Sequence, residues 1–221
     1  MFRLFRYLSP QYAEAFVNNG EMLFRALSYF RYYEDDGVRA DEYEGTLVHL
    51  PKEGLKACLV ETGAEVPIDY TFESSAREDE IFVYCMSTEC SALLASRFKT
   101  KACVEIFDLP RFFFYLRAAL VKYPDVQESQ LVYDKVRYYE PHEPPIVDWA
   151  LPERIALRKP KKFDWQREYR FAFPIGDAFA VENVNVKLVP VGTRRTSRSG
   201  ARPQMLLKLG NLSKLCRIHG F

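Results

Sequence analysis

The chain lacks a long apolar segment and an excess of either charge. No apolar run approaches the length that crosses a bilayer, and Arg3 and Arg6 interrupt the N-terminus where a signal peptide needs an apolar core. The 31 basic residues nearly balance the 30 acidic ones, for a net charge of +1, so no global field draws the protein toward nucleic acid or a membrane surface. We therefore expect a cytoplasmic protein without membrane contact.

Metal-binding and disulfide patterns are also scarce. The three histidines form no paired spacing, and the five cysteines are scattered and odd in number, which favours buried reduced thiols over a disulfide framework. No glycine-rich phosphate loop is present, and nothing local indicates a Cys–His nucleophile. We therefore expect no metal site. The residues concerned are His49, His142, His219, Cys58, Cys85, Cys90, Cys103 and Cys216.

Apolar and aromatic residues are abundant, at 48% and 15% of the chain, so a substantial core can form. Strand and helix patterns alternate without a repeat or a clear linker, which predicts one α+β domain over residues 1–221. Helices are expected at 10–19 after Ser9, at 88–98 after Ser87 or Thr88, and at 109–123 after Asp108. Strands are expected at 4–8, 46–50, 55–61, 66–72, 80–87, 102–107, 131–139, 165–173, 184–191, 204–209 and 214–218, with the three between 46 and 72 forming an antiparallel meander.

The segment 165–173 is the most informative part of the sequence. Read as a strand, it places Tyr169, Phe171 and Phe173 on one face, and its period of two puts Gln166, Glu168 and Arg170 together on the other. A carboxylate between a carboxamide and a guanidinium on a rigid strand can hold a charged substrate. The same pattern also solvates the outer face of a strand.

Other arginines have open interpretations. Arg6 is flanked by apolar neighbours in a predicted strand, so it needs either a ligand or a partner carboxylate. Arg31, Arg39 and Asp41 lie on or beside an acidic loop, where they form surface salt bridges or line a cleft. The segment 193–202 carries four arginines in ten residues, which is typical of a solvated loop and also suits phosphate contacts.

The order of several short motifs resembles a widespread bacterial domain of unknown function. Its members open with an aromatic-His-Tyr-Thr-Ser strand, continue with a Leu-x-Ser element, a polar loop ending in Glu-Gly, a Cys-x-Ser and a Cys-Val-x-Ile, and close with a Trp-x-x-Glu-x-Arg strand. The matching segments are Phe5-Arg6-Tyr7-Leu8-Ser9, Leu27-Ser28, Glu44-Gly45, Cys85-Met86-Ser87, Cys103-Val104-Glu105-Ile106 and Trp165 to Arg170.

That layout is in turn similar to the ADP-ribosyltransferase superfamily, including its DNA-targeting toxins. The resemblance implies a mostly antiparallel split sheet with flanking helices, and NAD as the substrate. It assigns the catalytic role to Glu168, within a Gln-x-Glu triplet, because a carboxylate can stabilise the oxocarbenium-like ribose that forms when nicotinamide leaves. It assigns NAD binding to Arg6, Tyr7, Ser28, Arg31, Arg39, Gln166 and Arg170.

Three functions follow from these patterns. The resemblance implies a toxin or antiphage effector that modifies nucleic acid or protein and has an antitoxin or partner protein. The alternative is a non-catalytic module that binds nucleic acid or a partner through the Arg194–Arg202 loop, with Arg194, Arg195 and Arg198 on phosphates. The third is a purely structural role for Glu168 and Arg170, worth about 0–1 kcal/mol if the pair is exposed.

Overall fold

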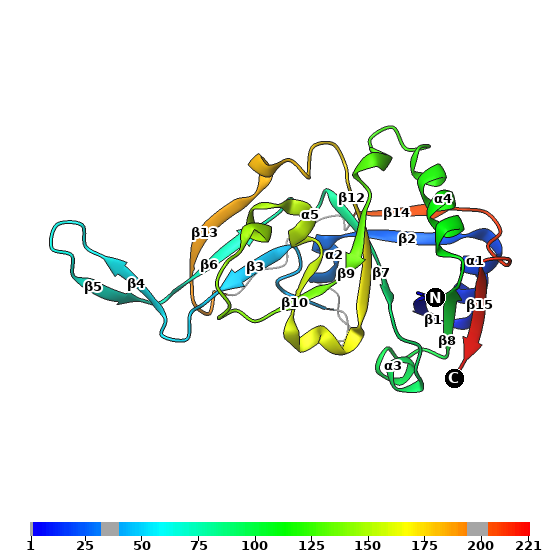
Figure 1. Ribbon diagram of the computed structural model, residues 1–221, viewed down its shortest axis with the longest axis horizontal. Helices are drawn as coiled ribbons and strands as arrows, with labels where there is room; N and C mark the ends of the chain where they lie inside the picture. The colour runs from blue at the N-terminus through cyan, green and yellow to red at the C-terminus, as the bar shows by residue number, and fades with distance from the viewer. Residues whose placement is uncertain (1, 32–39, 194–202) are drawn as a thin grey trace.

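The protein has a mixed α+β fold whose sheets are mostly antiparallel (Figure 1), as the sequence predicts. The computed structural model describes residues 2–31, 40–193 and 203–221. Within those ranges no helix is long and apolar enough to cross a membrane. The α-helices are α1 (Pro10–Asn19), α2 (Leu27–Arg31), α3 (Ala92–Arg97), α4 (Leu109–Leu120) and α5 (Pro152–Ile155). The 3₁₀ helices are η1 (Glu128–Gln130), η2 (Val147–Ala150), η3 (Lys161–Gln166) and η4 (Val181–Asn183).

The main sheet has eight strands. Six follow the order β14-β2-β7-β1-β8-β15, and β12 pairs with both β7 and β9. Their bounds are β1 (Leu4–Leu8), β2 (Glu21–Ala26), β7 (Ile81–Ser87), β8 (Ala102–Ile106), β9 (Val132–Lys135), β12 (Glu168–Pro174), β14 (Gln204–Lys208) and β15 (Cys216–Gly220). All pairs in this sheet are antiparallel.

The main sheet is split beside β7. One edge of β7 pairs with β12 along its whole length, from Ile81 to Ser87. Its other edge is shared, because β2 pairs at Phe82 and Val83 whereas β1 pairs only at Ser87. The residues of β7 between these contacts, 84–86, have no strand partner on that edge among the described residues. β1 and β2 therefore diverge, and an opening forms between them.

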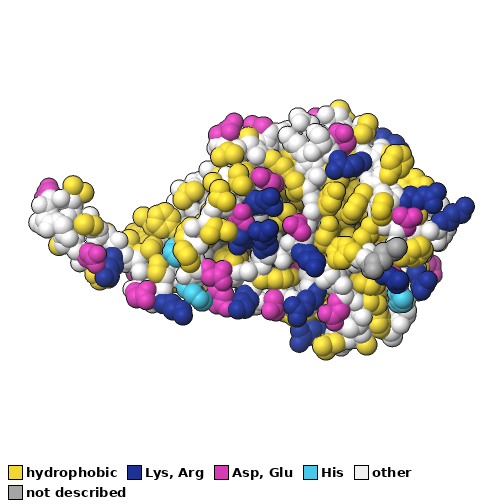
Figure 2. Space-filling model, viewed as in Figure 1, with side chains coloured by type: hydrophobic (Ala, Val, Ile, Leu, Met, Phe, Trp, Pro, Cys, Tyr) yellow, Lys and Arg dark blue, Asp and Glu magenta, His cyan; other side chains and the backbone are white. Residues whose placement is uncertain are grey.

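Three smaller sheets flank the main one. β13 (Asn185–Pro190), β6 (Tyr70–Ser75) and β3 (Thr46–His49) form an antiparallel sheet, and β10 (Arg137–Tyr139) pairs in parallel with β11 (Arg158–Pro160). β4 (Leu55–Cys58) and β5 (Glu65–Ile68) form a hairpin that projects from the body (Figure 1). The predicted simple meander over 46–72 is wrong, because β3 pairs with β6 and the hairpin lies between them in the chain. Figure 2 shows apolar side chains on this projecting hairpin.

Two helices cover one face of the main sheet with an aromatic core. Phe16 of α1 stacks on Tyr84 and on Phe112 of α4, with ring centroids 6.4 and 6.3 Å apart. Phe112 in turn contacts Phe171 of β12, at 5.9 Å. Tyr169, Phe171 and Phe173 all belong to this core, so the predicted apolar face of the strand is confirmed. The opposite face packs on a second cluster that includes Ala172.

Two predicted elements start later than expected. The segment 165–173 is not one strand, because Gln166 ends η3, Arg167 adopts a left-handed conformation (φ 46°), and β12 begins only at Glu168. α3 begins at Ala92 rather than at 88, since the Thr88 N–H bonds to the Arg167 carbonyl and keeps the chain extended. The cap is therefore Ser91, whose side chain accepts from the Leu94 N–H.

Candidate functional site

A pocket of about 660 Å³ occupies the split in the main sheet. Residues of β1, β2 and β7 form its walls, and the start of β12 closes one side. The lining includes Arg6, Tyr84, Cys85, Lys159, Gln166 and Glu168. Side chains that are far apart in the sequence therefore meet at one cavity, because the divergence of β1 and β2 leaves the middle of β7 uncovered.

Glu168 is the first residue of β12 and is only 5% exposed. Its Oε1 accepts from Arg170 Nε at 2.6 Å, and its Oε2 lies 3.2 Å from Lys159 Nζ. Its backbone N–H donates to the Tyr138 hydroxyl oxygen at 3.0 Å. Hydrogen bonds therefore hold both the backbone and the carboxylate of Glu168 in place. The estimate of about 0–1 kcal/mol for an exposed pair does not apply to Glu168 and Arg170, because both are buried.

The carboxyl of Glu168 is ionised at neutral pH. Burial raises its pKa, but the positive charges of Arg170 and Lys159 outweigh burial, and the pKa falls to about 2. Cys85 responds in the opposite direction. Burial, and then the neighbouring negative charge of Glu168, raise the pKa of its thiol to about 12. Cys85 is therefore a neutral thiol against an anionic carboxylate, and it is not an activated nucleophile.

Arg170 lies behind Glu168 and is fully buried. Its Nη2 donates to Glu44 Oε2 at 2.9 Å, its Nη1 contacts the other oxygen of Glu44, and Nη1 also donates to the Ala156 carbonyl at 2.8 Å. Arg170 does not line the pocket among the described residues. It supports the carboxylate that does.

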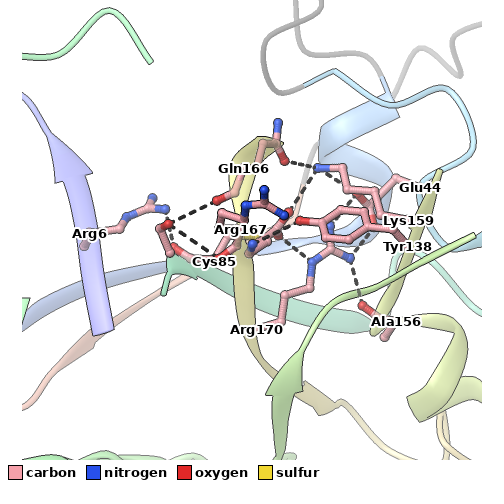
Figure 3. Close-up of polar contacts among 11 residues, drawn as sticks. Arg6, Glu44, Cys85, Tyr138, Ala156, Lys159, Gln166, Arg167 and Arg170 are labelled. Carbon is pink, nitrogen blue, oxygen red and sulfur yellow. Dashed lines mark hydrogen bonds and ion pairs between the residues drawn. The ribbon is translucent and has the colours of Figure 1, made fainter. Parts of the chain in front are cut away.

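Gln166 and Lys159 complete the polar floor of the pocket. Lys159 Nζ donates to Gln166 Oε1 at 2.9 Å, and both side chains are buried yet line the cavity. Gln166 thus joins Glu168 as the sequence predicts, but from the end of η3 rather than from the same strand. Figure 3 shows the carboxamide oxygen directed toward the lysine.

Arg6 reaches the pocket from β1, on the side opposite Lys159 in Figure 3. Its Nη1 contacts the Cys85 carbonyl, and its guanidinium carbon lies 4.6 Å from the centre of the Tyr84 ring. Arg6 has no carboxylate partner among the described residues, so the interpretation of Arg6 as half of an ion pair is not supported. Tyr7 also lines the pocket, but its hydroxyl accepts from the Ser91 N–H at 2.9 Å and anchors α3.

Three unpaired polar atoms belong to residues that line this cavity. Arg6 Nε, Ser9 Oγ and Thr100 Oγ1 are buried and have no hydrogen-bond partner in the described parts of the chain. Unpaired buried polar groups are unfavourable, and they commonly mark sites where a ligand or water completes the bonding. They lie at residues of β1, of the β1–α1 connection and of the segment before β8.

Two other predicted site residues lie away from the pocket. Ser28 is buried in α2, where its N–H donates to the Glu78 carbonyl, and it is not part of the lining. Arg31 donates to the Glu44 carbonyl, to Glu78 Oε1 and to Thr46 Oγ1 at 2.5–2.7 Å, and so holds the segment around Glu44 in place. These partners explain both positions structurally. Arg39, Arg194, Arg195 and Arg198 lie outside the described residues.

Sequence reasoning missed Lys159 and Glu44. Lys159 sits in a segment, 158–162, in which four of five residues are basic, and such a segment is typical of a solvated surface; Glu44 sits in an acidic segment. Lys159 is nonetheless 3% exposed and Glu44 is 1% exposed. The sequence offered one signal of burial, because the apolar Pro160 and Phe163 lie close to the lysine in the chain. In the structure the centre of the Phe163 ring lies 4.6 Å from Lys159 Nζ.

The described residues contain no group of three or more His, Cys, Asp or Glu side chains arranged to hold a metal ion. Comparisons of the chain with protein-family models, with curated proteins and with solved structures found no significant match.

Proposed function

We propose that the protein is an NAD-dependent ADP-ribosyltransferase whose NAD site is the pocket in the split sheet. The observation that carries this proposal is that Arg6 and Glu168 line one cavity, although 162 positions of sequence separate them. The resemblance assigned those two residues to the first-strand and catalytic positions. A shared cavity is what that assignment requires of Arg6 and Glu168, whereas Ser28, its third position, lies outside the lining.

The size and lining of the pocket suit a dinucleotide. Ligand pockets typically enclose about 300–1,000 Å³, and this one encloses about 660 Å³. Aromatic rings for stacking come from Phe30, Tyr84 and Phe98, among others. Four cationic side chains line the cavity against two acidic ones, which favours an anionic ligand such as a pyrophosphate. They are Arg6, Arg25, Lys99 and Lys159, against Glu21 and Glu168.

Glu168 fits the proposed chemistry because it is ionised and fixed. In ADP-ribosyl transfer the bond between C1′ of the ribose and the nicotinamide nitrogen breaks, and its electron pair leaves with nicotinamide. A nucleophile of the acceptor, or water, then attacks C1′ and releases a proton. A buried carboxylate beside the ribose can accept a hydroxyl hydrogen bond and stabilise the developing positive charge. The low pKa of Glu168 keeps this charge available at neutral pH.

The proposed acceptor is a nucleic acid or a protein, as in a toxin or an antiphage effector with a partner antitoxin. The arginines at 194, 195 and 198 remain candidates for phosphate contacts with such an acceptor. The same residues carry the alternative function, a non-catalytic binding module. A salt-dependent gel shift lost on their replacement, together with no NAD binding, would favour that alternative.

The test replaces the carboxylate without changing its shape. Glu168→Gln should lower the rate of nicotinamide release from NAD by at least a hundredfold, about 2.7 kcal/mol of transition-state stabilisation, while calorimetry still detects NAD binding. The matched control is Glu65→Gln, because Glu65 lies on the β4–β5 hairpin and its side chain is 61% exposed. Absence of NAD binding by the folded wild type would end the proposal.

A further inference from the structure

Lys159 is a buried lysine with an unusual set of contacts. Its ammonium lies 2.9 Å from Gln166 Oε1, 3.2 Å from Glu168 Oε2 and 3.9 Å from Glu44 Oε2. Its side chain is 4% exposed, yet it lines the pocket. The residue therefore touches both polar groups of the pocket floor and also borders the space that a ligand would fill.

The two cations that hold Glu168 have different positions. Arg170 binds Oε1 from behind and does not line the pocket among the described residues. Lys159 binds Oε2 from the pocket side. Arg170 is also bound to Glu44 through both oxygens of that carboxylate. Arg170 thus serves the buried charge balance, whereas Lys159 acts at the surface that meets the ligand.

Lys159 also fixes the orientation of Gln166. A carboxamide has an accepting end and a donating end, and an ammonium can only donate, so the oxygen of Gln166 must face Lys159. The amide nitrogen is then directed away from the lysine (Figure 3).

We propose that Lys159 is the positioning residue of the pocket, which holds the Glu168 carboxylate and the Gln166 carboxamide in one fixed arrangement toward the ligand. This inference rests on the proposed function for its catalytic consequence, but the arrangement itself can be tested without activity. Lys159 donates hydrogen bonds to both groups, and it comes from β11, which pairs with β10 in a separate two-stranded sheet.

The acid titration of Glu168 reports this arrangement directly. The charged and titratable groups around it come from several elements. Removal of one cation should therefore raise the pKa of Glu168 measurably, while the remaining cation still lowers it. They are Arg170 on β12, Lys159 on β11, Cys85 on β7 and Tyr138 on β10, and Glu44 and Asp41 of the segment 40–45 act on Lys159 in turn.

The experiment uses the full chain and two neutral variants, Lys159→Met and Lys159→Gln. Methionine matches the length of the lysine, and glutamine retains a donor, so the second variant serves if the first does not fold. The Glu168 carboxyl is titrated by carbon-13 NMR, and nicotinamide release is measured across pH. Lys161→Met is the matched control, because Lys161 is 60% exposed and pairs with Glu140 on the surface.

The proposal predicts that both Lys159 variants raise the pKa of Glu168 by at least one pH unit. It also predicts a loss of at least tenfold in kcat, with the acid limb of the kcat profile moved to higher pH by a similar amount and the KM for NAD within threefold. Lys161→Met should change none of these. If the wild type neither binds nor cleaves NAD, the proposed function falls, and the titration alone still decides the role of Lys159. An unchanged Glu168 titration in folded variants overturns the inference even if the wild type is active.

Discussion

Arg170 bridges two buried carboxylates, which would otherwise lack this positively charged partner. It is fully buried and bonds to Glu168 and Glu44. Burial lowers its pKa, but the two carboxylates outweigh burial and raise it well above the ordinary value, so the charge is permanent. Arg170→Met should therefore lower the free energy of unfolding by about 3–5 kcal/mol, because removal of one partner leaves buried charge uncompensated.

Urea unfolding at neutral pH measures this change. The control is Arg77→Met, since Arg77 is 42% exposed and pairs with Asp177 at the surface. Its loss should cost about 0–1 kcal/mol. A loss below about 1 kcal/mol for Arg170→Met would show that the buried cluster does not depend on the guanidinium.

Single residues of this site were predictable only where local pattern decides the outcome. The alternation Glu168, Tyr169, Arg170, Phe171 fixes which side chains share a face, and the structure agrees. Glu44 meets Arg170 across 126 positions of sequence. Nothing local specifies such a contact, because it depends on the register of β12 against β7 and on the path of the acidic segment.

At the scale of elements, α1 ends where the sequence predicts because Gly20 takes a conformation that other residues avoid. Its φ is 64°, and its N–H bonds to the Phe16 carbonyl. A Cβ at this position would lie 2.5 Å from the Gly210 carbonyl oxygen and 2.8 Å from the Gly210 nitrogen. Gly20→Ala should cost about 2–4 kcal/mol, from left-handed strain plus overpacking against backbone.

Gly176→Ala separates those two contributions. Gly176 has a similar φ of 58° but open space around the Cβ position, so its substitution should cost only the strain of about 1–2 kcal/mol. Chemical unfolding of both variants measures the difference. Equal losses would mean that the backbone at Gly210 yields without cost.

Other element boundaries depended on contacts that the sequence does not display. Thr88 directly follows β7, and its N–H donates to the carbonyl of Arg167, which has a left-handed conformation. This bond keeps the chain extended, so α3 starts later. Propensity alone favours an earlier cap, since Ser87 and Thr88 are good capping residues. The Ser87 hydroxyl instead donates to the Gln166 carbonyl at 3.1 Å. A tertiary contact therefore takes the group that a local cap would use.

At the scale of the whole molecule, the α+β class and the antiparallel sheets follow from alternating patterns, whereas the split does not. The split depends on how far β1 and β2 each pair along β7, at Ser87 and at Phe82 and Val83 respectively. Those pairings join strands far apart in the sequence, so local patterns do not specify them. The pocket is thus a property of the assembled fold rather than of any segment.

The stability of the folded protein should depend on pH through two buried carboxyls with opposite shifts. The folded pKa of Glu168 is depressed to about 2, so its contribution is present above the unfolded value near 4.5 and is lost as pH falls toward 2. Burial, and then repulsion by Glu44, raise the pKa of Asp41 from 3.8 to about 6. Asp41 therefore favours folding below pH 4, and that contribution is lost as pH rises to 6.

Asp41→Asn tests the second shift because it removes the titration and keeps the shape. Asp41 is 1% exposed, its Oδ1 accepts from the Tyr43 N–H, and its Oδ2 has no partner in the described ranges. Asparagine keeps the first contact without placing a charge at the second atom. We expect the stability advantage of the variant over the wild type to grow by about 1–3 kcal/mol as the pH rises from 4 to 7. Urea unfolding at each pH, with exposed Asp69→Asn as the control, measures this gain. If the difference between Asp41→Asn and the wild type stays constant across that range, Asp41 titrates normally and the buried cluster tolerates a third carboxylate.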